Sequence, residues 1–265
     1  ERWLGAHPER ELITRRYLKH RPDLTSEALG RLVHEETPDP ERGARRADRA
    51  EGALEQPLNL NEQRLAAVVA ALREAGAGTV MDLGCGEGRL LRALLDEKAF
   101  TKILGMDVSS RALAITERRL RLDRLPPLQR EKLTLVQGSL LYRDARLSGH
   151  DAAAVVEVIE HLDPPRLSAF ERVVFACARP RTVVITTPNR EYNALFPGLA
   201  AGAFRHRDHR FEWTRSEFEA WARGAADRNG YDVRFAPVGH EDSGLGAPTQ
   251  MGVFTRRDAP AGGAS

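Results

Sequence analysis

From about residue 61 onward, short apolar runs alternate with longer amphipathic stretches. Leu65, Val68, Val69 and Leu72 recur at the spacing of one helix face. The short apolar runs, which predict β-strands, are Thr79–Leu83, Ile103–Asp107, Leu133–Gln137, Ala152–Val156, Val183–Thr186, Tyr231–Phe235 and Met251–Thr255. The stretches that predict helices between them cover residues 88–97, 110–122, 164–178 and 215–228. This alternation predicts a parallel sheet with helices on both faces, and the last two strands, with no room for a helix between them, are expected to pair antiparallel.

Residues 1–57 lack a strand pattern. Scattered leucines indicate short helices, and the Pro-Asp-Pro turn and mixed charges of residues 37–55 are typical of a linker or an exposed helix. We therefore expect a helical N-terminal segment with a linker at residues 1–57 and an α/β domain at residues 58–265.

The composition is that of an ordinary folded chain. Hydrophobic residues make up 42% and charged residues 29%, and the formal net charge is +2. No stretch approaches the roughly 18 apolar residues of a membrane span, so no membrane contact is expected. The two distant cysteines, Cys85 and Cys177, exclude a disulfide framework or a zinc ribbon and fit a reducing cytoplasm. Because the chain begins at Glu1 without a signal-peptide pattern, we expect a fragment of a longer cytoplasmic protein.

A glycine-rich turn follows the first predicted strand. The run from Asp82 to Gly88 reads D-L-G-C-G-E-G, and its glycines at Gly84 and Gly86 let the backbone turn tightly and approach a ligand closely. A second acid, Asp107, ends the next strand about 20 residues on, where its carboxylate can accept both hydroxyls of an adenosine ribose. The turn therefore predicts a nucleotide-like cofactor.

Two cofactors fit this turn, a nicotinamide dinucleotide and S-adenosylmethionine. A dinucleotide turn is usually G-x-G-x-x-G with a pyrophosphate on the helix N-terminus. Here Asp82 and Glu87 place negative charge at that point, which disfavours a pyrophosphate and suits an ammonium group. The D-x-G-x-G pattern also resembles the first motif of class I methyltransferases, so we expect S-adenosylmethionine. The candidate cofactor-binding residues are Asp82, Gly84, Gly86, Asp107, Ser139, Leu140, and Arg64, which either pairs with the methionine carboxylate or is a solvated helix arginine.

Acidic and imidazole side chains gather after the fourth predicted strand. Glu157, Glu160 and His161 lie at positions i, i+3 and i+4, so a helical turn would place all three on one face. Ligands of open α/β sheets bind at this end of the strands, although an ordinary solvated helix would have the same pattern. A second run, at residues 204–214, supplies His209 as a fourth ligand. Two carboxylates and two imidazoles favour Mn²⁺ or Mg²⁺ over structural zinc, and the two positions left on an octahedral ion suit a vicinal diol.

Together these residues resemble the small-RNA 3′-terminal 2′-O-methyltransferases, over about residues 58–256. The matching motifs are D-L-G-C-G at 82–86, E-V-I-E-H at 157–161, T-P-N at 187–189 and D-H-R-F-E-W-T-R at 208–215. The resemblance implies a class I, Rossmann-like methyltransferase fold with a seven-stranded, mostly parallel sheet whose last strand is antiparallel. It implies methylation of the terminal ribose of RNA, with Mn²⁺ or Mg²⁺ held by the catalytic set Glu157, Glu160, His161 and His209. His206 lies outside the matching run.

The resemblance also implies partners. Bacterial members of the family have an extra region before the methyltransferase domain, and the run Tyr17–Arg21 resembles it. They work beside an RNA end-healing and ligating enzyme, and their methyl mark protects a repaired tRNA. We therefore expect the 3′ end of a tRNA or small RNA as substrate, and a repair enzyme as protein partner. Whether His161 or His209 also acts as a general base stays open.

Further side chains surround the predicted site. Thr187–Asn189 is expected to shape the ribose pocket, and Phe211 and Trp213 either stack on a base or pack in the core. The arginines that either contact RNA phosphates or are ordinary surface charges are Arg190, Arg205, Arg207, Arg210 and Arg215.

Two other functions fit the same residues. A metal-dependent methyltransferase could act on a small diol or catechol, and would need no basic surround. Alternatively, the chain is mainly a docking module that recruits an end-healing or ligase partner through residues 1–55.

Overall fold

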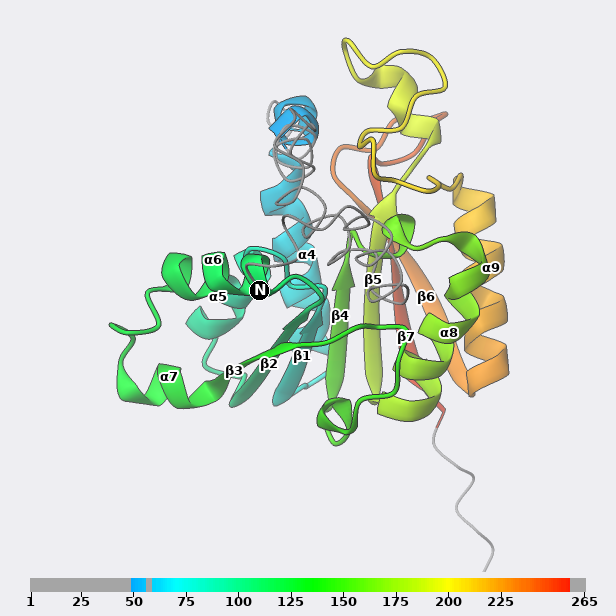
Figure 1. Cartoon of the computed structure of the whole chain (residues 1–265). Helices are drawn as coiled ribbons and strands as arrows, with labels where there is room; N and C mark the ends of the chain where they lie inside the picture. The colour runs from blue at the N-terminus through cyan, green and yellow to red at the C-terminus, as the bar shows by residue number, and fades with distance from the viewer. Residues whose placement is uncertain (1–48, 56–58, 258–265) are drawn as a thin grey trace, which may run out of the picture. The chain divides into compact units, whose positions relative to one another are not determined.

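The computed structural model describes residues 49–55 and 59–257 (Figure 1). The described residues from Glu51 on belong to one compact unit, which begins ahead of the boundary expected after residue 57. The short helices expected earlier in the chain, and residues 37–48 of the expected linker or exposed helix, lie outside the described residues, whereas residues 49–55 are helical. No helix in the described part combines the length and apolar character that a membrane crossing requires.

A seven-stranded sheet forms the centre of this unit, in the order β3-β2-β1-β4-β5-β7-β6. The strands are β1 (Thr79–Leu83), β2 (Lys102–Asp107), β3 (Leu133–Gln137), β4 (Ala152–Val156), β5 (Thr182–Pro188), β6 (Tyr231–Val238) and β7 (Thr249–Arg256). β1 to β5 pair in parallel, and β7 runs antiparallel between β5 and β6. The predicted sheet, including its antiparallel last strand, is confirmed.

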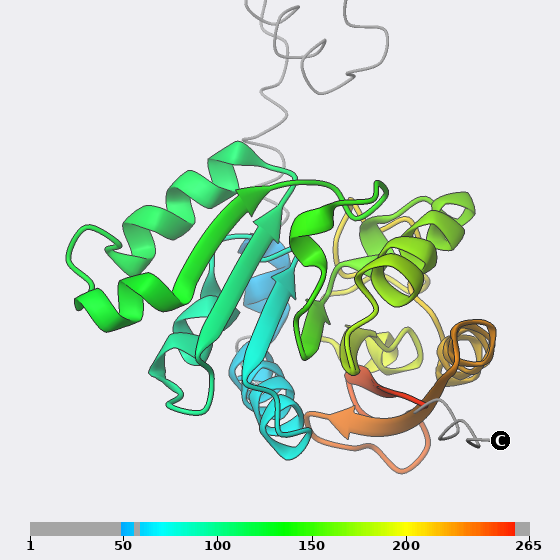
Figure 2. The same ribbon diagram turned by 90° about the horizontal axis from the view of Figure 1, so that it is seen from below.

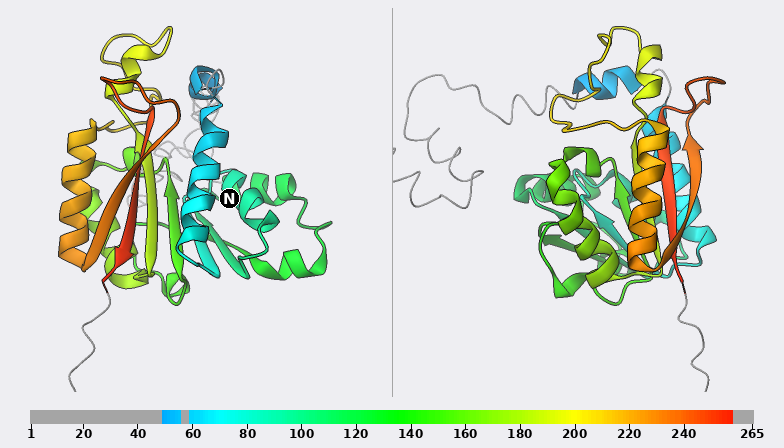
Figure 3. Two further views of the ribbon diagram at one scale, coloured as in Figure 1. Left: turned by 180° about the vertical axis from the view of Figure 1, so that it is seen from behind. Right: turned by 90° about the vertical axis from the view of Figure 1, so that its right-hand side faces the viewer.

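Helices cover both faces of the sheet (Figure 2). They are α4 (Leu60–Glu74), α5 (Arg89–Asp96), α6 (Ser110–Leu120), α7 (Pro127–Lys132), α8 (Leu167–Glu171) and α9 (Arg215–Asn229). Neighbouring strand residues point to opposite faces, so Val80 packs in the cluster with Val68 of α4, whereas Met81 packs in the cluster with Phe170 of α8 and Phe218 of α9. Figure 3 shows α4 and α9 on these opposite sides.

Two helical segments differ from the prediction. Residues 164–178, expected as one helix, divide into the 3-10 turn η5 (Pro164–Arg166), α8 and the π-helix η6 (Arg172–Ala178). The prolines at its start supply no N–H donor, which suits the first turn of a helix but no later one. The helix α7 has no counterpart in the prediction because it buries no side chain and so lacks an apolar stripe.

The carboxyl ends of the parallel strands meet at one edge of the sheet, at the top of Figure 1. The strand order changes direction between β1 and β4, and open α/β sheets bind ligands at such a switch point. The glycine turn follows β1, Asp107 ends β2, the 3-10 turn η4 (Ile159–His161) follows β4, and Thr187 lies near the end of β5. The topology therefore brings all the candidate motifs to the same edge.

Candidate active site

Hydrogen bonds fold the glycine turn back onto β2. The backbone N–H of Gly84 donates to the carbonyl oxygen of Met106, and that of Gly86 donates to Asp107 Oδ2 at 2.8 Å. Gly84 has a φ of 83°, and a Cβ there would lie 2.6 Å from Val158 Cγ2, so a larger residue does not fit. A Cβ on Gly86 would meet no heavy atom of the described residues within 4 Å. The backbone of Gly86 therefore faces open space that a ligand can enter.

Two carboxylates flank this turn. Asp107 accepts a second hydrogen bond, from the backbone N–H of Ser109 at 2.8 Å, and is thereby held in place. Asp82 is 2% exposed, and its Oδ2 has no hydrogen-bond partner in the described part of the chain. Burial, and then the charge of Asp107, raise the pKa of Asp82 to about 8. An acid in this position favours a cationic group over a phosphate, which agrees with the ammonium group of S-adenosylmethionine.

The turn also depends on a residue that the sequence analysis did not single out. Thr116 of α6 is fully buried, and its hydroxyl donates to the carbonyl oxygen of Gly86 at 2.8 Å. The sequence does carry a signal for Thr116: its hydroxyl lies in the apolar stripe of a predicted helix, and a buried donor there needs a hydrogen-bond partner. Of the two candidate cofactor-binding residues that follow β3, Ser139 is half-buried and Leu140 packs in the core.

The carboxylates after β4 are placed by β5. The expected helical turn over Glu157–His161 is only the 3-10 turn η4, which begins after Glu157. Glu157 itself has a φ of 52°, in the left-handed region that residues with a Cβ rarely adopt. Thr186 holds it there, since Thr186 Oγ1 donates to Glu157 Oε1 at 2.9 Å and the Glu157 N–H donates to the Thr186 carbonyl. Backbone strain of this kind clusters at functional sites.

Glu160 is fully buried. Its Oε2 accepts a hydrogen bond from Thr187 Oγ1 at 3.1 Å, and its Oε1 has no hydrogen-bond partner among the described residues. Burial, and then the neighbouring charge of Glu157, raise the pKa of Glu160 well above its usual range. Glu160 is buried and Glu157 half-buried, and each has an oxygen without a hydrogen-bond partner among the described residues, an environment that a divalent cation would stabilise. These residues therefore fit the metal that the sequence predicts.

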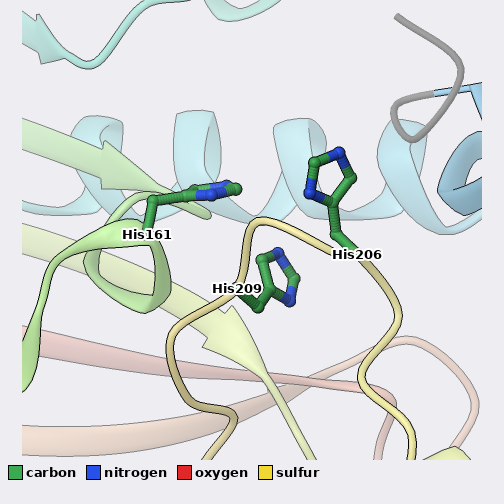
Figure 4. A group of neighbouring side chains, drawn as sticks. All are labelled: His161, His206 and His209. Carbon is green, nitrogen blue, oxygen red and sulfur yellow. The ribbon is translucent and has the colours of Figure 1, made fainter. Parts of the chain in front are cut away.

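Three imidazoles lie close together after β4 and β5 (Figure 4). One potential ligand atom from each of His161, His206 and His209 lies within 4.8 Å of the others, and no described carboxylate joins a group defined in this way. The ring centres of His161 and His209 are 4.7 Å apart, and His206 lies 5.5 and 5.4 Å from them. Desolvation and the two other rings lower the pKa of His161 to about 4. His206, which the sequence set leaves out, is thus a neighbour of both predicted histidine ligands.

A buried carboxylate fixes the orientation of His209. The Nδ1 of His209 lies 2.6 Å from Glu212 Oε1. Glu212 also accepts hydrogen bonds from the Asn193 side chain and the Arg205 backbone. Despite burial, these hydrogen bonds lower the pKa of Glu212. An ionised Glu212 accepts the proton on Nδ1 and leaves Nε2 as the free nitrogen, which is the arrangement of a metal-ligating histidine. That Nε2 lies 3.9 Å from Glu51 Oε1.

Arg64 is neither solvated nor exposed. It is 4% exposed, and its Nη2 lies 2.7 Å from Glu55 Oε1 and 3.2 Å from Glu157 Oε2. Its guanidinium also donates to Thr249 Oγ1. The predicted contact with a methionine carboxylate stays a prediction, and the alternative of a solvated helix arginine is wrong.

Arg205 differs from the other arginines around the site. Its side chain is fully buried and donates to the carbonyl oxygens of Asn189 and Pro248, so both predicted alternatives, a phosphate contact and a surface charge, are wrong for this residue. By contrast, the side chains of Arg207 and Arg210 remain more than half exposed, and within the described part of the chain their ion pairs with Asp208 and Asp163 are long, at 3.5 and 3.6 Å. Arginines that face solvent in this way can still contact RNA phosphates.

The aromatic and T-P-N residues support the site from within the fold. Phe211 is 8% exposed and its ring centre lies 4.3 Å from that of Trp213, which packs against the same core, so packing accounts for both rings. Asn189 donates from its side chain to the carbonyl oxygens of Leu245 and Ala247. It thereby ties the end of β5 to the loop between β6 and β7, and a role in a ribose pocket stays a prediction.

Comparisons with known proteins agree with this fold. A family model described as a methyltransferase domain matches residues 81–184, and a model described as "RNA repair, ligase-Pnkp-associating, region of Hen1" matches residues 1–33. The small RNA 2′-O-methyltransferase of Gallus gallus is 38% identical over 213 residues, which cover 78% of this chain and 56% of that protein. The chain spans about half the length of the curated relatives it matches.

Solved structures are similar as well. The methyltransferase domain of bacterial CtHen1 is 55% identical, with a TM-score of 0.70 over 75% of this chain and 100% of that one. A chain of the Pnkp1/Rnl/Hen1 RNA repair complex, 21% identical with a TM-score of 0.54 over 74% of this chain and 41% of that one, shares the fold. The sheet order and the glycine turn with its acid after β2 define a class I methyltransferase. Within that class, the identity to CtHen1 over its whole domain shows that the chain belongs to the Hen1 family.

Proposed function

We propose that this chain transfers the methyl group of S-adenosylmethionine to the 2′-hydroxyl of the 3′-terminal ribose of RNA. The observation that carries the proposal is the meeting of two sets of side chains at one edge of the sheet. The glycine turn and Asp107 form the first set, and the carboxylates and imidazoles after β4 and β5 form the second. The names of the relatives, small RNA 2′-O-methyltransferases, support the same reaction.

The second set of side chains supports a requirement for Mn²⁺ or Mg²⁺. Glu157, Glu160, His161 and His209 would hold the ion, and His206 offers a further nitrogen close to those of the two histidines. A mixture of oxygen and nitrogen donors without a thiolate favours these ions. A divalent cation bound there supplies Lewis acidity toward the hydroxyls of the terminal ribose.

The residues of the chain itself mainly position the reactants. Asp107 would accept the hydroxyls of the cofactor ribose, and Asp82 would face the ammonium group. Methyl transfer then needs the 2′ oxygen in line with the methyl carbon. The oxygen–carbon bond forms as the sulfonium carbon–sulfur bond breaks, and the hydroxyl proton leaves to a nearby imidazole or to water. Glu212 contributes by holding His209 in one orientation.

Methyl transfer to a short RNA tests this function. With labelled S-adenosylmethionine, the full chain should label an RNA that ends in a 2′,3′-diol, and a chelator should stop the reaction. The product should resist periodate, because only a modified terminal diol does so, and an RNA with a 2′-deoxy end should stay unlabelled. Labelling of diol and 2′-deoxy ends alike would rule out the proposed position. Labelling of a catechol but not of RNA would favour the small-molecule alternative.

We further propose that the N-terminal region recruits an RNA repair enzyme. The match of residues 1–33 to the ligase- and Pnkp-associating region of Hen1 supports this role. A chain that lacks residues 1–33 should keep its methyl transfer and lose retention of a ligase–Pnkp partner on an affinity column. Equal retention of the partner by both chains would contradict the proposal.

A further inference from the structure

The helical segment ahead of α4 packs onto the methyltransferase fold. Leu54 contacts a small apolar cluster formed by the buried side chains of Leu60, Tyr192 and Phe196. Glu55, the next residue, is 6% exposed. Residues 51–55 thus belong to the same compact unit as the sheet, where the sequence predicted a linker or an exposed helix.

Glu55 lies between two buried guanidinium groups. Its Oε1 is 2.7 Å from Arg64 Nη2 and 3.6 Å from Arg205 Nη1, and the Arg205 side chain is fully buried. Charges taken out of water in this way need close partners, and removing one partner leaves the other uncompensated. A single carboxylate therefore stabilises two buried cations.

Arg64 connects this pair to the candidate metal site. The nitrogen that contacts Glu55 also lies 3.2 Å from Glu157 Oε2. Arg205, Glu55, Arg64 and Glu157 thus form one row of alternating charges. If Glu55 were neutral, Arg64 would have Glu157 as its remaining close carboxylate, and the two would draw together. Glu157 would then offer less negative charge to a cation.

We propose that Glu55 is a positioning residue for the candidate metal site: by holding Arg64 and Arg205, it limits the pull of Arg64 on Glu157 Oε2 and keeps that oxygen available to a cation. This inference rests on the proposed function, because it assigns the cation site to the same side chains. Residues that orient a metal ligand usually change metal affinity by about 10- to 100-fold when they are replaced. The segment ahead of α4, residues 51–55, therefore contributes to the candidate metal site by positioning one of its ligands.

Titration of the full chain with Mn²⁺ alone, followed by electron paramagnetic resonance, tests the role of Glu55. Glu55→Gln should weaken Mn²⁺ binding about tenfold, and Glu55→Asp, which keeps the charge, should recover part of the affinity. Glu62→Gln is the matched control, since Glu62 is an exposed carboxylate on α4, and it should bind like the wild type. Affinity of Glu55→Gln within twofold of the wild type would overturn the inference.

Leu54→Ala separates positioning from packing. This change loosens the same segment and leaves every charge in place, so it should lower the melting temperature while Mn²⁺ affinity stays within about twofold of the wild type. If Leu54→Ala weakened Mn²⁺ binding as much as Glu55→Gln does, the segment would act by packing alone and the inference would be wrong. A wild-type chain that binds no Mn²⁺ would instead refute the metal site of the proposed function, and the inference with it.

Discussion

Replacing Glu212 with Gln should weaken the candidate metal site through His209. Glu212 is 2% exposed, and its two oxygens accept three hydrogen bonds, from the His209 ring, the Asn193 side chain and the Arg205 backbone. In Glu212→Gln, one of these oxygens becomes an NH₂ group that faces a donor. The negative charge that favours the Nδ1–H form of His209 is lost as well, so Nε2 is no longer kept free as the ligand atom.

The expected magnitude follows from these contacts. A hydrogen bond to a charged group contributes about 1.5–3 kcal/mol, and at least one of the three is lost, so we expect the variant to be about 2 kcal/mol less stable. Removing the carboxylate that orients a histidine ligand typically costs about 10- to 100-fold in metal affinity. This range equals about 1.4–2.8 kcal/mol of binding free energy.

Mn²⁺ titration near neutral pH measures the affinity, and thermal unfolding of the apo chain measures the stability. Glu219→Gln is the control, because Glu219 makes an exposed ion pair with Arg223 on the neighbouring helix surface and touches none of the candidate ligands. We expect the control to match the wild type in both measurements. A stable, folded Glu212→Gln chain that bound Mn²⁺ as tightly as the wild type would refute the role of this carboxylate.

Three further predictions concern the cofactor turn and the RNA. Gly86→Ala should lower the free energy of unfolding by about 1–2 kcal/mol, because Gly86 has a left-handed backbone. It should also weaken S-adenosylmethionine binding, measured by calorimetry. Unchanged binding would show that the open space beside Gly86 is not the cofactor site. Burial raises the pKa of Asp82 to about 8 in the folded chain, whereas an unfolded Asp has a pKa of about 3.9. Between these pH values the folded state binds more protons than the unfolded state. The free energy of unfolding should therefore fall as the pH rises from about 4 to 8. Asp82→Asn should flatten that slope in melts at several pH values, and an identical slope would contradict the assignment. Arg207→Gln and Arg210→Gln should each lower RNA affinity for every sequence. Each should also reduce the slope of log binding constant against log salt concentration by about 0.7 for each phosphate contact that is lost. Filter binding at several salt concentrations measures this slope, and an unchanged slope would contradict the phosphate contact.

Local periodicity was sufficient to predict most of the fold. Three of the seven strands, Thr79–Leu83, Leu133–Gln137 and Ala152–Val156, begin and end at the predicted residues. The others are longer than predicted. At the start of β7, the polar residues Thr249 and Gln250 pair in the sheet but interrupt the apolar run, whereas β6 continues past the predicted end through Ala236, Pro237 and Val238. The helix α7 was missed because a short exposed helix has no apolar face.

The same distinction holds for the candidate site: patterns within one segment could be predicted from the sequence, and contacts between segments could not. The glycine turn, Asp107 and the E-x-x-E-H run could be found in the sequence because each is a short pattern next to one strand. The burial of Arg205 and the approach of His206 to His161 could not, since they depend on contacts between separate elements. The left-handed Glu157 was equally hidden, because Thr186 of the neighbouring strand holds it.

By itself, the sequence determined the succession of strands and helices along the chain, the cofactor turn and the family. These properties depend on residues a few positions apart and on which side chains face water. The tertiary structure decided which side chains share the interior of the site. Glu55 and Arg64 pair next to Glu157 and Thr249, residues that follow much later in the chain. A buried charge takes whichever partner the packed fold brings within reach, and the spacing of residues along the chain does not record that choice.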